Sequence, residues 1–371
     1  MPERKPTVQV TERKPSVVDL FSGLGGLSAG LNDAGFKVVV ASEVDGDAIA
    51  TYRANHPQVK LLGDIRQLTG AKILKAARRA HIDVVVGCPP CQGFSRLTEK
   101  HRSRDPRNGL VLEFLRIVGE LKPTICMMEN VPGLMTRGSS LFKKLLHGLE
   151  EAGYQVKHAV LELADFGVPQ TRKRLVLVAG LGFDVELPSP THPGSENWVP
   201  AKRAIGALPK AVSRDDISRN RVPAHWHIAR AISDDVRKRL KHAATHGGSR
   251  NSLPKRLALE CHKRRTDGFS DVYGVIDLDA PSPTITSGCT NASKGRFGHP
   301  REHRPLTPRE AAMLQTLGRD YKLRGTGVES VAMQIGNALP RRFAKVAGKH
   351  LLKALAKQKA ALRKNHTDAS P

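Results

Sequence analysis

The stretch that decides the fold is Val17-Val18-Asp19-Leu20-Phe21-Ser22-Gly23-Leu24-Gly25-Gly26-Leu27. It begins as an apolar run typical of a buried strand, breaks at a glycine-rich turn and continues as a helical pattern that ends near Gly35. Glycines in such a turn let the backbone approach a ligand closely and take positive φ. Because Ser28 stands where the dinucleotide fingerprint has its third glycine, the pattern favours a nucleoside-bearing cofactor other than a nicotinamide dinucleotide.

Acidic residues end the next two predicted strands. The strand predicted at 37–42 ends in Glu43, about 20 residues after the glycine turn, which is the offset at which a carboxylate can bind ribose hydroxyls. Asp64 ends a short strand at 59–62 and offers a second carboxylate for an adenine amino group. An acid at one strand end is usually only solvated, but these features lie in order on successive strand ends and together predict a nucleoside site.

A cysteine follows the strand predicted at 82–86, in the sequence Gly87-Cys88-Pro89-Pro90-Cys91-Gln92. The carboxyl ends of parallel strands are where open α/β sheets build their active sites, so this placement suits a nucleophile. Two other interpretations stay open on these residues alone. Cys88 and Cys91 have thioredoxin-like spacing, and a cysteine is often a small buried hydrophobe.

The order of predicted elements indicates an α/β fold. Strands are expected at 16–21, 37–42, 59–62, 82–86, 124–128, 155–162 and 174–179, and helices near 26–34, 45–54, 70–80, 109–121 and 140–152. This alternation predicts a parallel sheet with covering helices. From Gly180 to about Arg304, prolines, glycines, histidines and basic clusters predict a smaller, irregular domain. Thr307 and Pro308 then open a helix, and a second helix is expected from about Pro340 to Gln358.

The composition predicts a protein that binds a polyanion. The 371 residues include 60 Lys and Arg against 35 Asp and Glu, a net charge of +25 spread along the chain, and the phosphate backbone is the commonest polyanionic partner. Five cysteines with irregular spacing indicate a reducing compartment. The polar start at 1–15 is not a secretory signal, and no apolar stretch is long enough to cross a bilayer. We therefore expect a cytoplasmic protein that does not bind membranes.

In family order and along nearly its whole length, the chain resembles the DNA (cytosine-5)-methyltransferases. The resemblance rests on Asp19 to Gly26, Gly87 to Ser95, Glu129-Asn130-Val131, Gln170-Thr171-Arg172-Lys173-Arg174, Arg309-Glu310 and Gln334-Ile335-Gly336-Asn337. It implies an S-adenosylmethionine-dependent enzyme that methylates carbon 5 of a cytosine in a specific sequence of duplex DNA. Such an enzyme is part of a restriction-modification system or a solitary modification enzyme, and we expect a monomer.

The resemblance also implies a division of the chain. A Rossmann-like methyltransferase sheet with covering helices is expected at 14–180, a smaller irregular target-recognition domain at 181–305, and a C-terminal segment at 306–359 that packs back on the first domain. The ends at 1–13 and 360–371 are expected to be flexible tails.

Four catalytic residues are implied by the resemblance. The thiolate of Cys91 adds to carbon 6 of a cytosine flipped out of the duplex. Glu129 donates a hydrogen bond or a proton to ring N3. Arg172 lies near the ring carbonyl oxygen, where a fixed cation stabilises developing charge, and Arg174 belongs to the same set. This chemistry requires no metal.

Binding residues are carried over position by position. The cofactor pocket would be formed by Phe21, Gly23, Gly25, Glu43, Val44, Asp64, Pro89, Leu110 and Asn337. DNA contacts are expected from Gln92, Ser95, Arg107 and Thr284. Val44 departs from the family pattern, which often has a larger side chain there to stack on adenine.

Three alternative functions share part of these features. A tRNA methyltransferase of the same family would share Cys91 and Glu129, but the long basic segment between Arg174 and Arg309 favours duplex DNA. A thioredoxin-like oxidoreductase would use Cys88 and Cys91 together. A DNA-binding protein that has lost catalysis is disfavoured because the catalytic set is intact.

Overall fold

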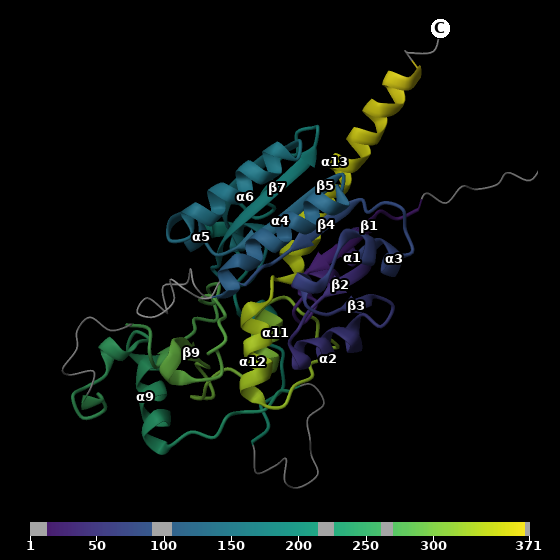
Figure 1. Ribbon diagram of the computed structural model, residues 1–371. Coiled ribbons are helices and arrows are strands. Elements are labelled where there is room, and N and C mark those ends of the chain that lie inside the picture. Colours follow the sequence, from purple (N-terminus) through teal and green to yellow (C-terminus); the bar gives the residue numbers. More distant parts are fainter. Residues whose placement is uncertain (1–12, 91–105, 214–225, 261–269, 368–371) are drawn as a thin grey trace, which may run out of the picture.

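The centre of the molecule is a seven-stranded sheet in the order β3-β2-β1-β4-β5-β7-β6 (Figure 1). The computed structural model describes residues 13–90, 106–213, 226–260 and 270–367. The strands are β1 (Ser16–Leu20), β2 (Lys37–Ser42), β3 (Lys60–Leu62), β4 (Val84–Gly87), β5 (Ile125–Asn130), β6 (Tyr154–Glu162) and β7 (Lys173–Leu181). All seven predicted strands are confirmed, with ends that shift by at most two residues.

The prediction of a wholly parallel sheet was wrong at β7. This strand pairs antiparallel with both β5 and β6. A parallel connection needs a crossover of a dozen or more residues, usually a helix. Between Glu162 and Lys173 the chain has only the short 3-10 helix Leu163–Phe166, so it turns back on itself.

Alternation along the strands divides the core between the two faces of the sheet. Val17, for example, faces the cluster that contains Leu31 and Phe343, whereas Val18 faces the cluster with Phe114 and Leu145. The first face is covered by α1 (Gly26–Ala34) and α13 (Arg341–Thr367), the second by α3 (Gly70–Ala77), α4 (Leu110–Leu121) and α6 (Ser139–Glu151). α2 (Gly46–Asn55) and α5 (Gly133–Thr136) complete the helices of this part of the chain.

The region from 181 to 305 contains mostly short elements. It contains α7 (Lys202–Ile205), α9 (Asp234–Thr245), β8 (Gly274–Val275) and β9 (Arg296–Gly298), together with 3-10 helices at Ser195–Asn197, Arg250–Ser252 and Ala292–Lys294. Part of it has a small cluster of its own, made of Leu240, Ala243, Tyr273, Val275 and Ala292. Figure 1 shows α9 and β9 set apart from the sheet, with α11 and α12 lying between this pair and the sheet.

The C-terminal segment returns to the sheet. α11 (Pro308–Leu314) begins with the predicted Thr307 cap, in a capping box with Glu310. α12 (Val328–Asn337) was not predicted. The last helix begins at Arg341 as expected but was predicted to end near Gln358, whereas it continues to Thr367. It packs along α1, and its Phe343 meets Phe166 of the 3-10 helix Leu163–Phe166 edge to face, with ring centroids 5.0 Å apart.

Candidate active site

The glycine turn after β1 is held by side chains from two other segments. Gly25 has φ 95°, and a Cβ there would lie 2.6 Å from Nε2 of His56 and 2.9 Å from the hydroxyl of Tyr321. Tyr321 donates to the carbonyl of Leu24 at 2.7 Å, and burial lowers the pKa of His56, which favours a neutral ring. Only glycine fits this position, because both the conformation and the space exclude a side chain.

Asp19 is a buried carboxylate just before this turn. Its Oδ2 accepts a hydrogen bond from the hydroxyl of Ser28 at 2.6 Å, and that hydroxyl also lies 2.7 Å from the hydroxyl of Tyr52. Oδ1 is buried and has no partner among the described residues. Burial raises the pKa of Asp19 to about 7, against the lowering effect of Ser28. The sequence analysis gave Asp19 no role, although an acid inside an apolar strand is a signal that could have found it.

Glu43 is fixed at the end of β2 by backbone donors. One of its oxygens accepts from the amide of Gly23 at 2.8 Å, and the other from the amides of Val44 and Asp45 at 2.8 and 2.9 Å. The structure therefore brings the predicted Glu43 and Gly23 into direct contact. Val44, beside them, leaves an apolar side chain 66% exposed.

Asp64 lies at the end of β3, where it pairs with a neighbour. Arg66 donates to its carboxylate at 2.5 Å, and these hydrogen bonds hold the pKa of Asp64 below its ordinary value. Asp64 also accepts from the amide of Arg66 as a helix cap. A ligand amino group at Asp64 would share the carboxylate with an arginine that is itself largely exposed.

The segment before the predicted nucleophile is tied to β5. The side-chain amide of Asn130 donates to the carbonyl of Pro89 at 3.1 Å, and its oxygen accepts from the amide of Val131 at 2.9 Å. Asn130 therefore fixes the backbone two residues before Cys91, which itself lies outside the described residues. Burial, followed by the nearby Glu129 carboxylate, raises the pKa of Cys88 well above its ordinary value. That environment favours a protonated Cys88 thiol, which is a poor nucleophile.

Glu129 and Arg174 form an ion pair at the ends of the adjacent strands β5 and β7. Nε of Arg174 lies 2.7 Å from Oε1 of Glu129, and the two side chains are only 13% and 9% exposed. A carboxylate and a guanidinium so close together in a nearly dry setting interact more strongly than a surface pair. The pair stands beside Cys88, three residues before Cys91.

Arg172 occupies a different environment from the one predicted. Its guanidinium is 2% exposed and donates to the carbonyls of Ile285, Gly336 and Ala338 at 2.8 to 3.2 Å. It thus joins the 181–305 region, at Ile285, to the C-terminal segment. Of the two predicted arginines, it is Arg174 that lies beside Glu129.

Thr284 likewise makes an internal contact. Its hydroxyl donates to the carbonyl of Thr171 at 2.7 Å. Next to it, fully buried Gln170 accepts from the amide of Ile285 and donates to the carbonyl of Leu314. These bonds fix where the 181–305 region rejoins the sheet.

The remaining predicted residues divide into two groups. Phe21 and Leu110 are partly buried and pack against the same hydrophobic cluster, while Asn337 is exposed at the last residue of α12. Gln92, Ser95 and the side chain of Arg107 lie outside the described part of the chain.

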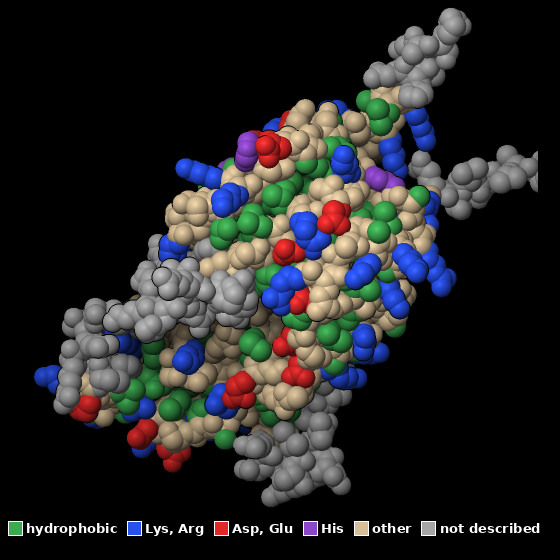
Figure 2. Space-filling view, viewed as in Figure 1, with side chains coloured by type: hydrophobic (Ala, Val, Ile, Leu, Met, Phe, Trp, Pro, Cys, Tyr) green, Lys and Arg blue, Asp and Glu red, His purple; other side chains and the backbone are tan. Residues whose placement is uncertain are grey.

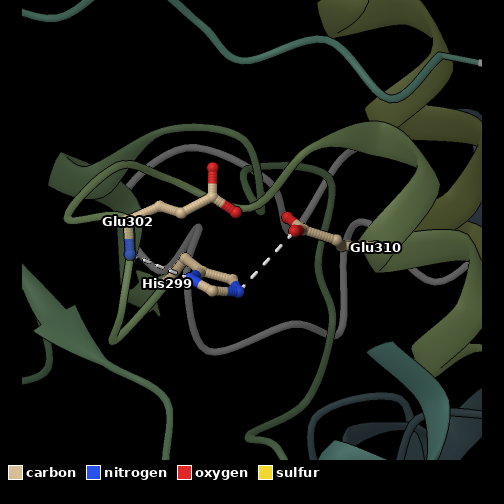
Figure 3. Close-up of side chains that lie close together, drawn as sticks. All are labelled: His299, Glu302 and Glu310. Atoms are coloured by element: carbon tan, nitrogen blue, oxygen red, sulfur yellow. Dashed lines mark hydrogen bonds and ion pairs between the residues drawn. The ribbon is translucent and has the colours of Figure 1, made fainter. Parts of the chain in front are cut away.

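A second polar cluster, His299, Glu302 and Glu310, has the residue types of a metal site (Figure 3). Arg304, however, binds both carboxylates: it meets Glu310 at 2.7 and 2.8 Å and Glu302 at 2.9 and 3.1 Å. Nδ1 of His299 accepts from the amide of Glu302 at 3.1 Å. The guanidinium of Arg304 therefore already provides the positive charge that a metal ion would bring to this cluster. The cluster links the end of β9 to the start of α11.

The strand order with one antiparallel strand, the glycine turn after β1 and the acid after β2 define a Rossmann-like methyltransferase fold. The family model of the C-5 cytosine-specific DNA methylases matches residues 16–353. The chain is 35% identical to the type II methylase M.HgiDII of Herpetosiphon aurantiacus, over 92% of this chain and 96% of that one. It is 33% identical to the type II methyltransferase M1.HphI of Haemophilus parahaemolyticus, over 91% and 86% of the two chains.

Solved structures give the same result. A protein described as a DNA modification methyltransferase encoded within an Escherichia coli prophage is 25% identical, with a TM-score of 0.72 over 92% of this chain and 100% of that one. The chain belongs to the C-5 cytosine-specific DNA methylase family, and it is a DNA (cytosine-5)-methyltransferase. In the part that the structure describes, no helix has the length and apolar character needed to cross a membrane.

Proposed function

We propose that the cofactor is S-adenosylmethionine and that it binds along the ends of β1, β2 and β3. Two features support the fit. Glu43, at the strand end where an acid can bind ribose hydroxyls, is held in one orientation by three backbone donors. Oδ1 of Asp19 is a buried acceptor without a described partner, and such an atom is stabilised by a cationic ligand group. When bound, this cofactor supplies an electrophilic methyl group.

Covalent activation of the cytosine is assigned to Cys91. Its thiolate adds to carbon 6, which breaks the aromaticity of the ring and makes carbon 5 nucleophilic enough to accept the methyl group. Loss of the proton from carbon 5 then expels the Cys91 sulfur and restores the ring. The anchor of Asn130 on Pro89 supports this assignment because it fixes the backbone that leads to Cys91.

Charge on the ring is handled by the pair of Glu129 and Arg174. When the ring gains electrons, Glu129 holds a proton at N3, and the guanidinium of Arg174 stabilises negative charge toward the carbonyl oxygen. In this proposal Arg174 takes the role that the sequence analysis gave to Arg172. The observation that carries it is the 2.7 Å ion pair with Glu129.

Duplex DNA binds between the carboxyl ends of β1, β2, β4 and β5, here called the strand edge, and the 181–305 region, which reads the target sequence. Reaching a stacked base requires flipping it out, and Gln92, Ser95 and Arg107 are proposed to contact the DNA near the flipped base. Thr284 is proposed to act through Thr171 rather than on DNA directly. The type II names of the relatives support a role in restriction-modification. We further propose that the enzyme is a cytoplasmic monomer and needs no metal, since Arg174 provides the cation.

Bisulfite sequencing tests the proposed function most broadly. DNA from a host that expresses the chain should carry methylated cytosines in one short sequence context, and a host that expresses Cys91→Ser should carry none. Purified enzyme with isotope-labelled S-adenosylmethionine should then label a duplex of that sequence but not tRNA. Labelling of tRNA alone, or methylation that survives Cys91→Ser, would contradict the proposal.

A further inference from the structure

The last helix, α13, carries basic side chains and no acidic ones. Its sequence, RRFAKVAGKHLLKALAKQKAALRKNHT, has nine Lys and Arg and neither Asp nor Glu. Five of the cations are exposed and recur every three or four residues: Arg342, Lys345, Lys349, Lys353 and Lys357. Residues three and four apart lie on one face of a helix, so these five form a single line, here called the α13 stripe, roughly 22 Å long.

Packing does not account for the α13 stripe. The residues that α13 buries against α1 and the sheet, Phe343, Ala344, Ala347, Leu351 and Leu355, lie on the other side of the helix. Like charges four residues apart destabilise a helix, and a surface needed only for solubility mixes both signs. The helix dipole favours cations in the last turn alone, whereas the stripe begins in the first.

The acids near the stripe are paired mainly with other residues, although Lys357, after Lys157, also helps to lower the pKa of Asp184. Of the nearby acids, Asp33 pairs with Arg341 at 2.7 Å, and both Asp184 and Glu186 pair with Lys157. The structure gives the five stripe cations no ion pair with any residue that it describes. A groove of about 610 Å³ is lined by four of them, Arg342, Lys345, Lys349 and Lys353, and by the hydroxyl residues Ser189 and Thr191. Cations and hydroxyls in one groove match the groups that bind phosphate oxygens.

The α13 stripe leads away from the active site. The chain just before α13 passes Gly26, next to the glycine turn, while Leu352 lies beside Gly35, which precedes the opposite, amino end of β2. Figure 1 shows the helix continuing past the sheet on the side away from α9 and β9, and Figure 2 shows basic side chains on the described part of this projection. A short duplex held at the active site therefore cannot cover the whole stripe.

We propose that the α13 stripe binds a second segment of duplex DNA, separate from the segment that holds the target cytosine. Its length matches roughly 7 base pairs at 3.4 Å each. A membrane surface fits less well, since such helices present a broad apolar face and Leu362 is the one large hydrophobic side chain exposed on the described part of α13. Two attachments would keep the enzyme on long DNA after it leaves a target.

Capture of a second duplex tests this proposal. The full-length enzyme is immobilised on a biotinylated 20-base-pair duplex and offered a fluorescent duplex of unrelated sequence. The stripe variant, Lys345→Gln/Lys349→Gln/Lys353→Gln/Lys357→Gln, is compared with a control of equal charge change, Lys37→Gln/Lys60→Gln/Lys143→Gln/Lys144→Gln, whose four lysines are exposed elsewhere. We expect the native enzyme and the control to capture the second duplex and the stripe variant to lose at least tenfold in affinity.

Salt dependence and turnover separate this proposal from the proposed function. The slope of log affinity for the second duplex against log salt should fall by about 0.9 for each phosphate contact that the stripe variant loses. Methyl transfer to a short target duplex should be unchanged in the stripe variant, so a defect there points to the active site instead. Equal capture by the native enzyme and the stripe variant overturns the proposal, as does stripe-dependent binding to anionic phosphatidylserine vesicles that excess DNA does not displace.

Discussion

The strand edge of the sheet and the 181–305 region are held in place by different kinds of interaction. The edge rests on two large clusters whose central strand residues are fully buried. In the other region the cluster around Leu240 has only five buried members, and a larger cluster that includes Ile205, Ile285 and Phe297 packs the region against α11 and α12. Buried polar bonds made by Gln170, Arg172 and Arg304 reinforce these junctions. The strands are therefore held almost entirely by apolar packing, whereas the 181–305 region is held by apolar packing together with buried polar contacts, each of which one substitution can remove.

The largest effect on stability is expected at Arg304. Truncation with Arg304→Ala leaves Glu310 buried without its partner and should lower the free energy of unfolding by about 3–5 kcal/mol. Arg296→Ala is the matched control, since its pair with Asp271 is exposed and should be worth less than about 1 kcal/mol. Urea denaturation measures both, and similar losses for the two variants would remove the contrast between buried and exposed contacts.

The pH dependence of the Arg304 effect has a definite sign. Burial alone would raise the pKa of Glu310, but the hydrogen bonds from Arg304 outweigh it and hold the pKa below its ordinary value of 4.5. The stabilisation is thus present above pH 4.5 and is lost as the pH falls through the lower folded-state value. The difference between native protein and Arg304→Ala should shrink correspondingly in acid.

At the strand edge, Asp19→Asn should stabilise the protein. The folded-state pKa near 7 means that ionising Asp19 opposes folding as the pH rises from about 4 to 7, by roughly 4 kcal/mol at most. The gain of the variant should therefore be absent at pH 4 and largest at or above pH 7. Thermal unfolding at several pH values measures it, and calorimetry should show weaker binding of S-adenosylmethionine. A variant that is less stable than the native protein at pH 8 would contradict this account of the buried carboxyl.

The two arginines of the Gln170 to Arg174 motif should behave differently. Arg174→Lys keeps a cation beside Glu129 but loses the planar guanidinium, and it should lower kcat by about 10²–10³-fold with little change in Tm. Arg172→Ala leaves three buried carbonyl groups without their hydrogen-bond donor and should therefore lower Tm clearly. Single-turnover methyl transfer and thermal unfolding distinguish them, and an unchanged Tm in Arg172→Ala would place that residue in the chemistry after all.

The smallest effects are expected from two glycines. A Cβ at Gly336 would lie 2.2 Å from the amide nitrogen of Ser287, so Gly336→Ala should overpack the junction and cost about 1–3 kcal/mol. Gly119, inside α4, has no atom within 4 Å of such a Cβ, and Gly119→Ala should stabilise by about 0.5–1 kcal/mol. Equal effects at the two positions would show that the close approach at Gly336 is relieved by movement.

Features that are set by local sequence could be predicted, whereas features that depend on contacts distant in sequence could not. Strands such as 37–42 and the glycine turn are set by local periodicity and backbone chemistry, so their places followed from the pattern. The pairing of Glu129 with Arg174 rather than Arg172 depends on the antiparallel entry of β7, which no local pattern encodes. α12 was missed because its short amphipathic run lies between loops, and the anchoring role of Asn130 depends on a contact 41 residues away in sequence.

Covalent trapping tests the central claim most directly. A duplex that carries 5-fluorocytosine at the target position cannot lose a proton from carbon 5, so the adduct with the enzyme should persist once the methyl group has been transferred. Peptide mapping of the trapped complex should place the DNA on Cys91, with the same yield in Cys88→Ser and none in Cys91→Ser. An adduct on Cys88, or no adduct from an enzyme that methylates the ordinary duplex, would contradict the account.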